Sequence, residues 1–473
     1  MTPSEDLKRA SDAPALHPTI FVIFGITGDL AARKLLPALL ALFSKKLLPP
    51  RFAIVGFSRR YFSREEFREL IRSRLNIKPG QFKEEDIKHF LDHISYEQGN
   101  FDSPPAYARL SERLANIDNG WGQCSNKLFH LSVPPNLYEG ILTNLASSRL
   151  TEPCDDMTGW TRVLIEKPFG NDIITARSLD KLLGRLFKEQ QIFRIDHYLA
   201  KEALQNIIAF RFANPMFEPM WNKSYIDKVH IKLYERGGTE GRSAYYDPIG
   251  ALRDVGQNHM LQMLALIAME EPKSFAAKDI RKARVAVMEA LRKFSKRELA
   301  DAVIRGQYAG YLSEQGVPAQ SRTETYFRIR AFIGLSRWKN VPFYLESGKA
   351  LYESKTEIDI YFKPKEHSPE AQNILTFRIQ PDEGIKIKFF VKTPANTFAT
   401  EAKTLKFKYS DTPSFGIIQN DYERLLHDAF IGDQTLFTST EEIMASWEFV
   451  TPILQGWKDL PLRQYQKGAR EIE

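Results

Sequence analysis

An eight-residue stretch, Arg194 to Lys201, combines side chains that could do acid–base chemistry and bind an anion. It contains a carboxylate (Asp196), an imidazole (His197) and a phenol (Tyr198), and a cation stands at each end. A carboxylate can orient an imidazole that acts as a base, and cations with a phenol can hold a phosphate. The stretch therefore indicates a site for a phosphorylated substrate.

A second candidate base is His259, which ends the sequence Arg253-Asp254-Val255-Gly256-Gln257-Asn258-His259. The residues that follow, Met260 to Met269, are nearly all apolar, so we expect this helix to enter a core. A neutral imidazole there could serve as a general base if a partner orients it. By residue type alone a histidine satisfied within the core is the commoner case, and both interpretations stay open at this point.

A glycine turn, Gly25 to Leu30, lies between the apolar run that ends at Phe24 and a series of leucines at helical spacing. Glycines between a strand and a helix permit a tight turn and close approach of the backbone to a pyrophosphate. An ordinary strand-to-helix turn is the alternative, because two glycines are a weak signal alone. The residues expected to bind a dinucleotide here are Gly25, Thr27, Gly28, Asp29 and Leu30.

Two arginines, Arg59 and Arg60, follow the second predicted strand. An enzyme that uses NAD usually has Asp or Glu at that position to bind the ribose hydroxyls, whereas guanidinium groups suit a 2′-phosphate. The sequence therefore favours NADP, with Arg59 as a cofactor ligand, over a solvated pair of arginines. Lys167 follows another predicted strand, at the edge where open α/β sheets bind ligands; a solvent-facing loop lysine is the alternative.

The first half of the chain alternates short apolar runs with amphipathic stretches. This order predicts parallel strands joined by helices, which is a Rossmann-like doubly wound sheet. Ser63 and Glu66 have the spacing of a capping box at the start of one helix. The expected strands are 20–24, 52–56, 127–133, 162–165 and 192–195, and the expected helices are 29–43, 63–75, 137–145 and 174–187.

After about residue 225 the strands alternate apolar and polar residues and follow one another closely. Pro381-Asp382-Glu383-Gly384 has the composition of a turn between two of them. This pattern predicts a larger α+β domain with a mostly antiparallel sheet. We expect a disordered tail at 1–19, a Rossmann-like domain at 20–200, and a substrate-binding and dimerisation domain at 201–473.

Composition bounds the class of protein. The 473 residues are 43% hydrophobic and 26% charged, which is typical of globular domains. A net charge of +7 suits small anionic substrates but is too diffuse to indicate a nucleic-acid partner. Cys124 and Cys154 form no CxxC pair and no metal-ligand spacing, so we expect two reduced thiols and no metal. Without a signal peptide or membrane span in the pattern, we expect a cytoplasmic protein.

Several motifs together resemble the glucose-6-phosphate dehydrogenase family. They are Gly-Ile-Thr-Gly-Asp-Leu-Ala at 25–31, Glu-Lys-Pro-Phe-Gly at 166–170, Arg-Ile-Asp-His-Tyr-Leu at 194–199 and Arg-Asp-Val-Gly-Gln-Asn-His at 253–259. Val341-Pro342-Phe343-Tyr344 and Ser347-Gly348-Lys349 continue the resemblance, which runs from about residue 20 to about 460. The motif at 194–199 is highly specific to that family, whereas the glycine turn is not.

The resemblance implies a reaction and a set of roles. The reaction is NADP-dependent oxidation of glucose 6-phosphate at C1 to a lactone, the first step of the oxidative pentose phosphate pathway. His259 is similar to the family's general base and Asp196 to its carboxylate partner. The resemblance also implies a homodimer or tetramer. The implied substrate ligands are His197, Tyr198 and Lys201 for the phosphate, Glu235, Asp254 and Lys349 for the sugar, and Lys167 between sugar and nicotinamide, with Lys34 facing the pocket.

The chain departs from the family pattern at Glu346, where arginine is usual, and at the carboxyl terminus, which lacks the usual glycine-tryptophan ending. The first departure bears on the sugar contacts near Lys349, and the second on any structural NADP site. Two alternatives therefore remain: a dehydrogenase of another sugar or sugar phosphate, and a catalytically silent cofactor-binding homologue. A silent homologue would not need a full set of candidate catalytic and phosphate-binding residues, and this chain has such a set in Asp196, His197, Lys201 and His259.

Overall fold

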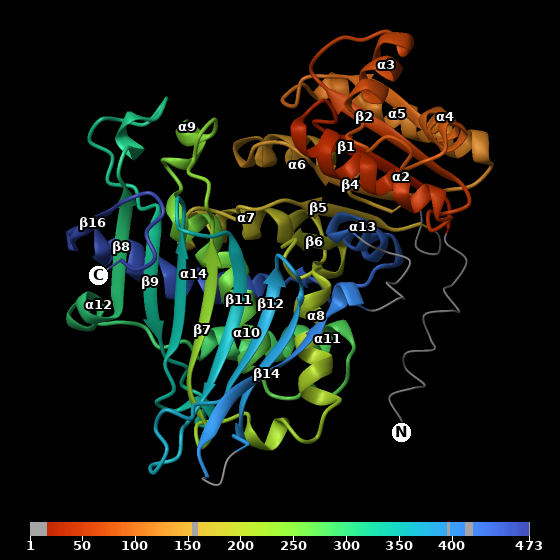
Figure 1. Ribbon diagram of the computed structural model, residues 1–473. Coiled ribbons are helices and arrows are strands. Elements are labelled where there is room, and N and C mark those ends of the chain that lie inside the picture. The colour runs from red at the N-terminus through yellow and green to blue at the C-terminus, as the bar shows by residue number, and fades with distance from the viewer. Residues whose placement is uncertain (1–16, 154–158, 395–397, 412–419, 473) are drawn as a thin grey trace. The chain divides into compact units, whose positions relative to one another are not determined.

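The computed structural model describes residues 17–153, 159–394, 398–411 and 420–472. Its backbone forms two compact units, each with its own sheet (Figure 1). The first unit comprises residues up to 170, 174–200 and 416–440, and the second comprises 171–173, 201–415 and 441–473. Most of the predicted tail, residues 1–16, lies outside the described residues, and Thr19 already belongs to the first strand.

The first unit is built on a seven-stranded sheet in the order β15-β6-β5-β4-β1-β2-β3. The first six strands in the chain are parallel, five of them where strands were predicted and β3 where none was, and only β15 runs antiparallel to its neighbour β6. Every residue of β1 and β4 is buried, because helices cover both faces of a parallel sheet. The strands are β1 (Thr19–Phe24), β2 (Phe52–Ser58), β3 (Ile94–Gln98), β4 (Asn126–Leu131), β5 (Thr161–Ile165), β6 (Ile192–Ile195) and β15 (Phe437–Thr438).

The helices of the first unit follow the crossovers between these strands. Ser63 and Glu66 form the predicted capping box at the start of α3. The first crossover helix begins with a π-helical segment, η2 (Ala31–Leu35), which the leucine spacing did not predict. The helices are α2 (Leu36–Ser44), α3 (Arg64–Arg74), α4 (Glu84–Asp92), α5 (Pro104–Trp121), α6 (Tyr138–Ser147), α7 (Ile173–Leu186) and α13 (Asp421–Ile431).

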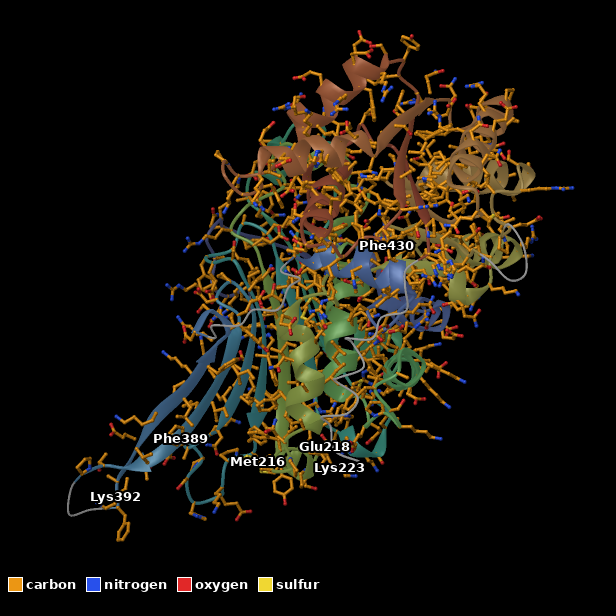
Figure 2. The ribbon with its side chains drawn as sticks, turned by 90° about the vertical axis from the view of Figure 1, so that its right-hand side faces the viewer. Met216, Glu218, Lys223, Phe389, Lys392 and Phe430 are labelled. Carbon is orange, nitrogen blue, oxygen red and sulfur yellow. The ribbon has the colours of Figure 1, made fainter. Side chains whose placement is uncertain are left out.

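Helix α13 and strand β15 return to the first unit from a distant part of the chain, which the sequence pattern did not predict. Arg162 Nη1 donates to the carbonyl oxygens of Ala429 at 2.6 Å and Phe430 at 3.0 Å. Phe430, labelled in Figure 2, packs edge-on against Phe21 with ring centroids 5.9 Å apart. Gln434 Nε2 donates to the carbonyl oxygen of Ile192 at 3.0 Å. The returning segment thus completes the core and one edge of the sheet.

The second unit is built on a nine-stranded sheet in the order β14-β13-β12-β11-β7-β10-β9-β8-β16. Most neighbours are antiparallel, as predicted, but β7 and β10 are parallel and so are β8 and β16. Figure 2 labels Phe389 and Lys392 toward the end of β13. The strands are β7 (Ile226–Tyr234), β8 (Val303–Tyr308), β9 (Tyr326–Ala331), β10 (Phe343–Gly348), β11 (Lys355–Phe362), β12 (Ile374–Gln380), β13 (Gly384–Lys392), β14 (Thr400–Lys408) and β16 (Leu462–Tyr465).

Helices pack on this sheet through a long apolar stretch. All eight residues of α10 (Leu261–Ala268) are buried, and α10 packs against α8 and α11. It continues η6 (Leu252–Met260), a π-helical segment. The remaining helices are α8 (Glu202–Phe212), α9 (Ser243–Tyr246), α11 (Ala277–Glu289), α12 (Lys296–Ala302) and α14 (Thr440–Gly456). None of the described helices is long and apolar enough to cross a bilayer.

One expectation about the cysteines is wrong. Cys124, just after α5, is disulfide-bonded rather than a reduced thiol. Cys154 lies outside the described residues. The prediction failed because it rested on spacing along the chain, which does not show which side chains are close in space. The cysteine count therefore gives no support to a reducing compartment.

Candidate functional site

The glycine turn depends on residues without a side chain, because its backbone is left-handed at Gly25 and packs closely on neighbouring main chain. Gly25 has φ 81°, and a Cβ there would lie 2.4 Å from the carbonyl oxygen of Ser132. Its N–H donates to Phe57 at 2.8 Å, and the N–H of Gly28 donates back to Gly25 at 2.9 Å. The turn joins β1 to a helix, which is the geometry that binds a dinucleotide pyrophosphate in Rossmann-like sheets.

The side chains of the turn meet the end of β2. The hydroxyls of Thr27 and Ser58 lie 3.1 Å apart, so the turn and the end of β2 are joined directly. Asp29 is exposed and lies 3.7 Å from Arg33, one helical turn later. Leu30 precedes η2, on which Lys34 is exposed. The predicted cofactor residues Gly25, Thr27, Gly28, Asp29 and Leu30 thus form one continuous turn.

Arg59 and Arg60 directly follow β2, and their side chains are exposed. Their backbone is fixed from β3: Gln98 Nε2 donates to the carbonyl oxygen of Arg59 at 3.0 Å, and the Tyr96 hydroxyl donates to that of Arg60. The main chain is therefore held while the guanidinium groups stay accessible. This is the arrangement expected of side chains that read a 2′-phosphate.

Lys167 and the Asp196 turn follow neighbouring parallel strands, β5 and β6. Lys167 is half-buried, and its bond to Pro168 is cis. Asp196 is 2% exposed and accepts the N–H of Tyr198 at 3.1 Å. Because the strands are parallel, these residues come to the same edge of the sheet as the glycine turn.

The residues after Asp196 form a tight turn that leads into α8. The rings of His197 and Tyr198 lie 5.1 Å apart, with His197 half-buried and Tyr198 buried. Lys201 is the residue before α8 and begins the second unit. The structure thus gathers Asp196, His197 and Tyr198 in one turn.

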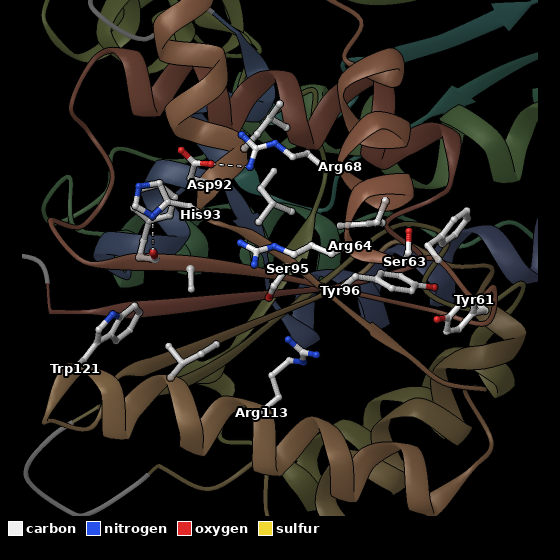
Figure 3. Close-up of a pocket in the computed structure, with 17 residues that line it drawn as sticks. Tyr61, Ser63, Arg64, Arg68, Asp92, His93, Ser95, Tyr96, Arg113 and Trp121 are labelled. Carbon is white, nitrogen blue, oxygen red and sulfur yellow. Dashed lines mark hydrogen bonds and ion pairs between the residues drawn. The ribbon is translucent and has the colours of Figure 1, made fainter.

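A cavity of about 640 Å³ lies elsewhere in the first unit, along the free edge of β3 (Figure 3). Arg113 lines it from α5 and Arg68 from α3, and both arginines already have acidic partners. Arg68 pairs with Asp92 at 2.6 Å, and Arg113 pairs with Glu97 at 2.8 Å. None of the predicted site residues lines this cavity, so it is distinct from the glycine turn.

In the second unit, the ammonium group of Lys349 lies close to two other predicted substrate ligands, Glu235 and Asp254. Lys349 Nζ lies 2.6 Å from Glu235 and 3.9 Å from Asp254. Glu235 follows β7 and Lys349 follows β10, and these strands are parallel, so both residues come to one sheet edge. The Lys349 side chain is only 6% exposed, whereas the two carboxylates are more than 30% exposed. The cluster therefore presents acceptors to a ligand while its cation stays held.

Tyr246 is a member of this cluster that sequence reasoning missed. Lys349 Nζ lies 5.2 Å from the centre of its ring, a cation–π distance. Tyr246 is buried, and burial together with the charge of Glu324 raises its pKa well above the ordinary value. A tyrosine two residues before a proline carries no distinctive signal, and only the fold shows that it contacts Lys349.

The π-helical segment η6 carries both Asp254 and His259. Gly256 lets it pack closely, because a Cβ there would lie 2.8 Å from the ring of Phe327 on β9. His259 is 1% exposed, and its N–H donates to the Asn258 side chain at 2.6 Å. Its role as a base stays a prediction, because a histidine that only packs in the core would be buried as well.

Glu346, the departure from the family pattern, is held away from the lysine cluster. It accepts hydrogen bonds from Tyr326 at 2.7 Å and lies 2.7 Å from His230 Nε2. Burial alone would raise its pKa, but the interactions with His230 and Tyr326 hold the pKa of Glu346 below its ordinary value. Its carboxylate is thus hydrogen-bonded within the sheet, and no ion pair joins it to Lys349 among the described residues.

Comparison with known proteins identifies the family. The model of the glucose-6-phosphate dehydrogenase NAD binding domain matches residues 22–206, and that of the C-terminal domain matches residues 208–473. Glucose-6-phosphate 1-dehydrogenase of Aggregatibacter actinomycetemcomitans is 41% identical over 95% of this chain and 93% of its own. That of Chlamydia pneumoniae is 39% identical over 93% of this chain and 90% of its own.

Solved structures agree with these matches. A glucose-6-phosphate dehydrogenase in complex with glucose 6-phosphate superposes with a TM-score of 0.88 at 34% identity, covering 96% of this chain and 95% of that one. The enzyme of Mycobacterium avium superposes with a TM-score of 0.81 at 31% identity, covering 95% of each chain. The resemblance inferred from the motifs is confirmed: the chain belongs to the glucose-6-phosphate dehydrogenase family.

Proposed function

We propose that this chain oxidises glucose 6-phosphate at C1 to 6-phosphoglucono-lactone and passes the hydride to NADP. The observation that carries the proposal is the 34%-identical structure solved with glucose 6-phosphate, to which 96% of the chain corresponds. The glycine turn of the first unit and the Lys349 cluster of the second supply groups of the right chemistry. The chain would thus catalyse the first step of the oxidative pentose phosphate pathway.

The proposed base is His259, which takes the proton from the C1 hydroxyl as the hydride leaves C1. Asp196 would keep the imidazole in the tautomer that accepts this proton and would stabilise the imidazolium that forms. These two roles rest on the family motifs, since the residues belong to different units. Lys167 would lie between the sugar and the nicotinamide.

The remaining ligands divide between the two ends of the substrate. His197, Tyr198 and Lys201 would hold the phosphate, which is remote from C1, so that its binding energy positions the reacting carbon. Glu235 and Asp254 would accept hydrogen bonds from sugar hydroxyls, and Lys349 would donate one. The ion pair of Lys349 with Glu235 at 2.6 Å fixes the cation in place before a sugar arrives.

The residues of the turn fit a dinucleotide, because Gly25, at φ 81° and packed closely on the main chain of Ser132, forms the tight turn between β1 and the following helix on which a pyrophosphate binds. When bound, the cofactor accepts the hydride at C4 of its nicotinamide. We propose NADP rather than NAD because Arg59 and Arg60 are exposed at the end of β2. A charged hydrogen bond contributes about 1.5–3 kcal/mol, so Arg59→Ala should raise KM for NADP about 10- to 150-fold and leave KM for NAD nearly unchanged. An equal rise for both cofactors would show that Arg59 does not read the 2′-phosphate.

The activity itself is tested by the absorbance of reduced cofactor on mixing the folded protein with glucose 6-phosphate and NADP. Unphosphorylated glucose, galactose 6-phosphate and NAD complete the panel. We expect the highest kcat/KM with glucose 6-phosphate. A higher value with another sugar would establish the alternative dehydrogenase, and no turnover with any member of the panel would establish the silent homologue.

We further propose a homodimer or tetramer that assembles through the nine-stranded sheet, and a cytoplasmic location. The location is supported by the substrate, since a sugar phosphate does not cross a bilayer unaided. Light scattering after gel filtration measures the oligomer, and a monomeric mass would contradict it. Thiol alkylation of Cys124 in freshly lysed cells tests the location, since a persistent disulfide there would favour an oxidising compartment.

A further inference from the structure

A second cavity, of about 370 Å³, lies within the second unit. Four cationic side chains line it, each from a different part of the chain: Arg253 on η6, Arg305 on β8, Arg322 before β9, and Lys458 after α14. The indole of Trp457, itself 3% exposed, forms an apolar part of the wall. Apolar walls exclude water, which strengthens the attraction between such cations and an anion.

The cations of this cavity have no acidic partners among the residues that the structure describes. The hydrogen bonds of Arg253 go to the carbonyl oxygens of Asn171 at 3.0 Å and Ile249 at 3.1 Å. Arg305 Nη2 donates to the carbonyl oxygen of Leu460 at 2.9 Å. These acceptors are neutral, and the carboxylate of Glu324 acts on Arg253 and Arg305 through its charge without forming an ion pair with either. This differs from the β3-edge cavity of Figure 3, where Arg68 and Arg113 are paired.

Arg305 is the most deeply buried of the four cations. It is 4% exposed, and its Nε–H is buried without a hydrogen-bond partner in the described part of the chain. Burial and the nearby charge of Arg322 lower the pKa of Arg305. A buried guanidinium group is costly unless an anion compensates it. A ligand with several negative oxygens would supply that compensation.

The two acidic residues of the cavity do not fill this role. Asp247 already accepts hydrogen bonds from the hydroxyls of Tyr311, at 2.9 Å, and Ser321. Glu324 accepts the N–H of Leu252 at 3.1 Å, and burial raises the pKa of Glu324 to about 7. The four cations of the lining outnumber these two carboxylates. The cavity keeps a net positive charge.

We propose that this cavity binds a small anion with phosphate-type oxygens, at a site separate from the residues proposed to hold the sugar phosphate. Guanidinium groups bind phosphate oxygens through paired hydrogen bonds, and three of the four cations here are arginines. The site adjoins the sugar ligands through η6, where Arg253 lines the cavity and the next residue, Asp254, lies 3.9 Å from Lys349. An anion in the cavity therefore contacts the same helix as the proposed substrate site.

The test is isothermal titration of the full chain with inorganic pyrophosphate, which needs no turnover and so is independent of the proposed function. Arg322 is exposed, and Arg322→Gln should fold normally. We expect this variant to weaken pyrophosphate binding at least about tenfold, as the loss of a charged hydrogen bond does. Arg463→Gln is the matched control, because Arg463 is also exposed and does not line the cavity, and it should change the affinity less than about twofold.

Three results would overturn the proposal. One is the absence of binding by the unmodified protein. Another is equal weakening by Arg322→Gln and Arg463→Gln, which would reflect net charge alone. The third is binding that survives Arg322→Gln but is lost in Lys201→Met, because the pyrophosphate would then occupy the proposed sugar-phosphate site.

Discussion

The glycine turn of the first unit and the lysine cluster of the second hold their candidate ligands by different means. At the turn, the backbone defines the space: Gly25 has φ 81°, and its neighbours are hydrogen-bonded main chain. In the cluster, side-chain charges from β7, β10 and η6 meet around Lys349. Substitutions that add a side-chain atom should therefore disrupt the turn. The cluster should instead accept substitutions that keep the shape of a side chain, provided that they do not remove a charge or a proton acceptor. Four substitutions test this difference.

The largest effect is expected at His259, which shares η6 with the cluster. Asparagine keeps polarity but cannot accept a proton at neutral pH, and a general base contributes about 10²–10⁴-fold to the rate. His259→Asn should therefore lower kcat by that order and leave KM for glucose 6-phosphate within a few fold. His230→Asn is the control for loss of a histidine in the same unit. Near-normal kcat in folded His259→Asn would restore the core-histidine interpretation.

We expect the glycine turn to be most sensitive to a substitution that disturbs its backbone. A side chain at Gly25 would adopt a left-handed conformation and meet the carbonyl oxygen of Ser132 at 2.4 Å. We expect Gly25→Ala to lower the free energy of unfolding by about 2–4 kcal/mol and to weaken NADP binding. Gly122 also has positive φ but has nothing within 4 Å, so Gly122→Ala should cost only about 1 kcal/mol. Equal losses in urea denaturation would mean that the close approach at Gly25 is unimportant.

We expect the lysine cluster to be most sensitive to a substitution that removes its positive charge. Lys349→Met keeps the length of the side chain but leaves Glu235 and Asp254 without their cation. We expect KM for glucose 6-phosphate to rise about 10- to 150-fold, corresponding to about 1.5–3 kcal/mol, while the affinity for NADP is unchanged. Lys232→Met removes a similar ion pair, with Asp359 at 2.6 Å, and should leave KM unaltered. If KM for glucose 6-phosphate rose equally in Lys349→Met and Lys232→Met, the cause would be a less stable sheet rather than the loss of a substrate ligand.

The smallest effect concerns Glu324, whose carboxylate accepts the N–H of Leu252 at the start of η6. Its pKa is raised from 4.5 to about 7, so the folded protein binds this proton more tightly than the unfolded chain. Stability from this group is therefore present at low pH and is lost as pH rises from about 4.5 through 7. Between pH 6 and 8 we expect a loss of about 1.4 kcal/mol that Glu324→Gln removes. An unchanged pH dependence in the variant would show that Glu324 ionises normally.

Local sequence patterns predicted the parts of the fold that local interactions determine. The apolar runs gave β1, β2, β5 and β6 within a few residues, because strands buried on both faces have no polar positions. The turn at 381–384 connects β12 and β13 as expected. The π-helical segments η2 and η6 were not predicted, since their hydrophobic spacing is close to that of an α-helix.

Partners distant in sequence were predictable only through the family resemblance. Glu235, Asp254 and Lys349 are separated by up to 114 residues, and no periodicity connects them. The disulfide of Cys124 and the four cations of the second cavity were not predicted at all, from the local pattern or from the resemblance. Glu235 and Lys349 meet because β7 and β10 are parallel, a pairing that alternation of residues does not specify.

The return of α13 and β15 to the first unit has a consequence for synthesis on the ribosome. The unit's amino-terminal strands emerge first, but Arg162 and the edge of β6 find their partners only when residues beyond 416 have been translated. Until then the nascent chain carries an unfinished sheet with an open edge, which is prone to pair with other chains. The nucleotide-binding half should therefore mature late, and a fragment ending near residue 200 should depend on chaperones or aggregate.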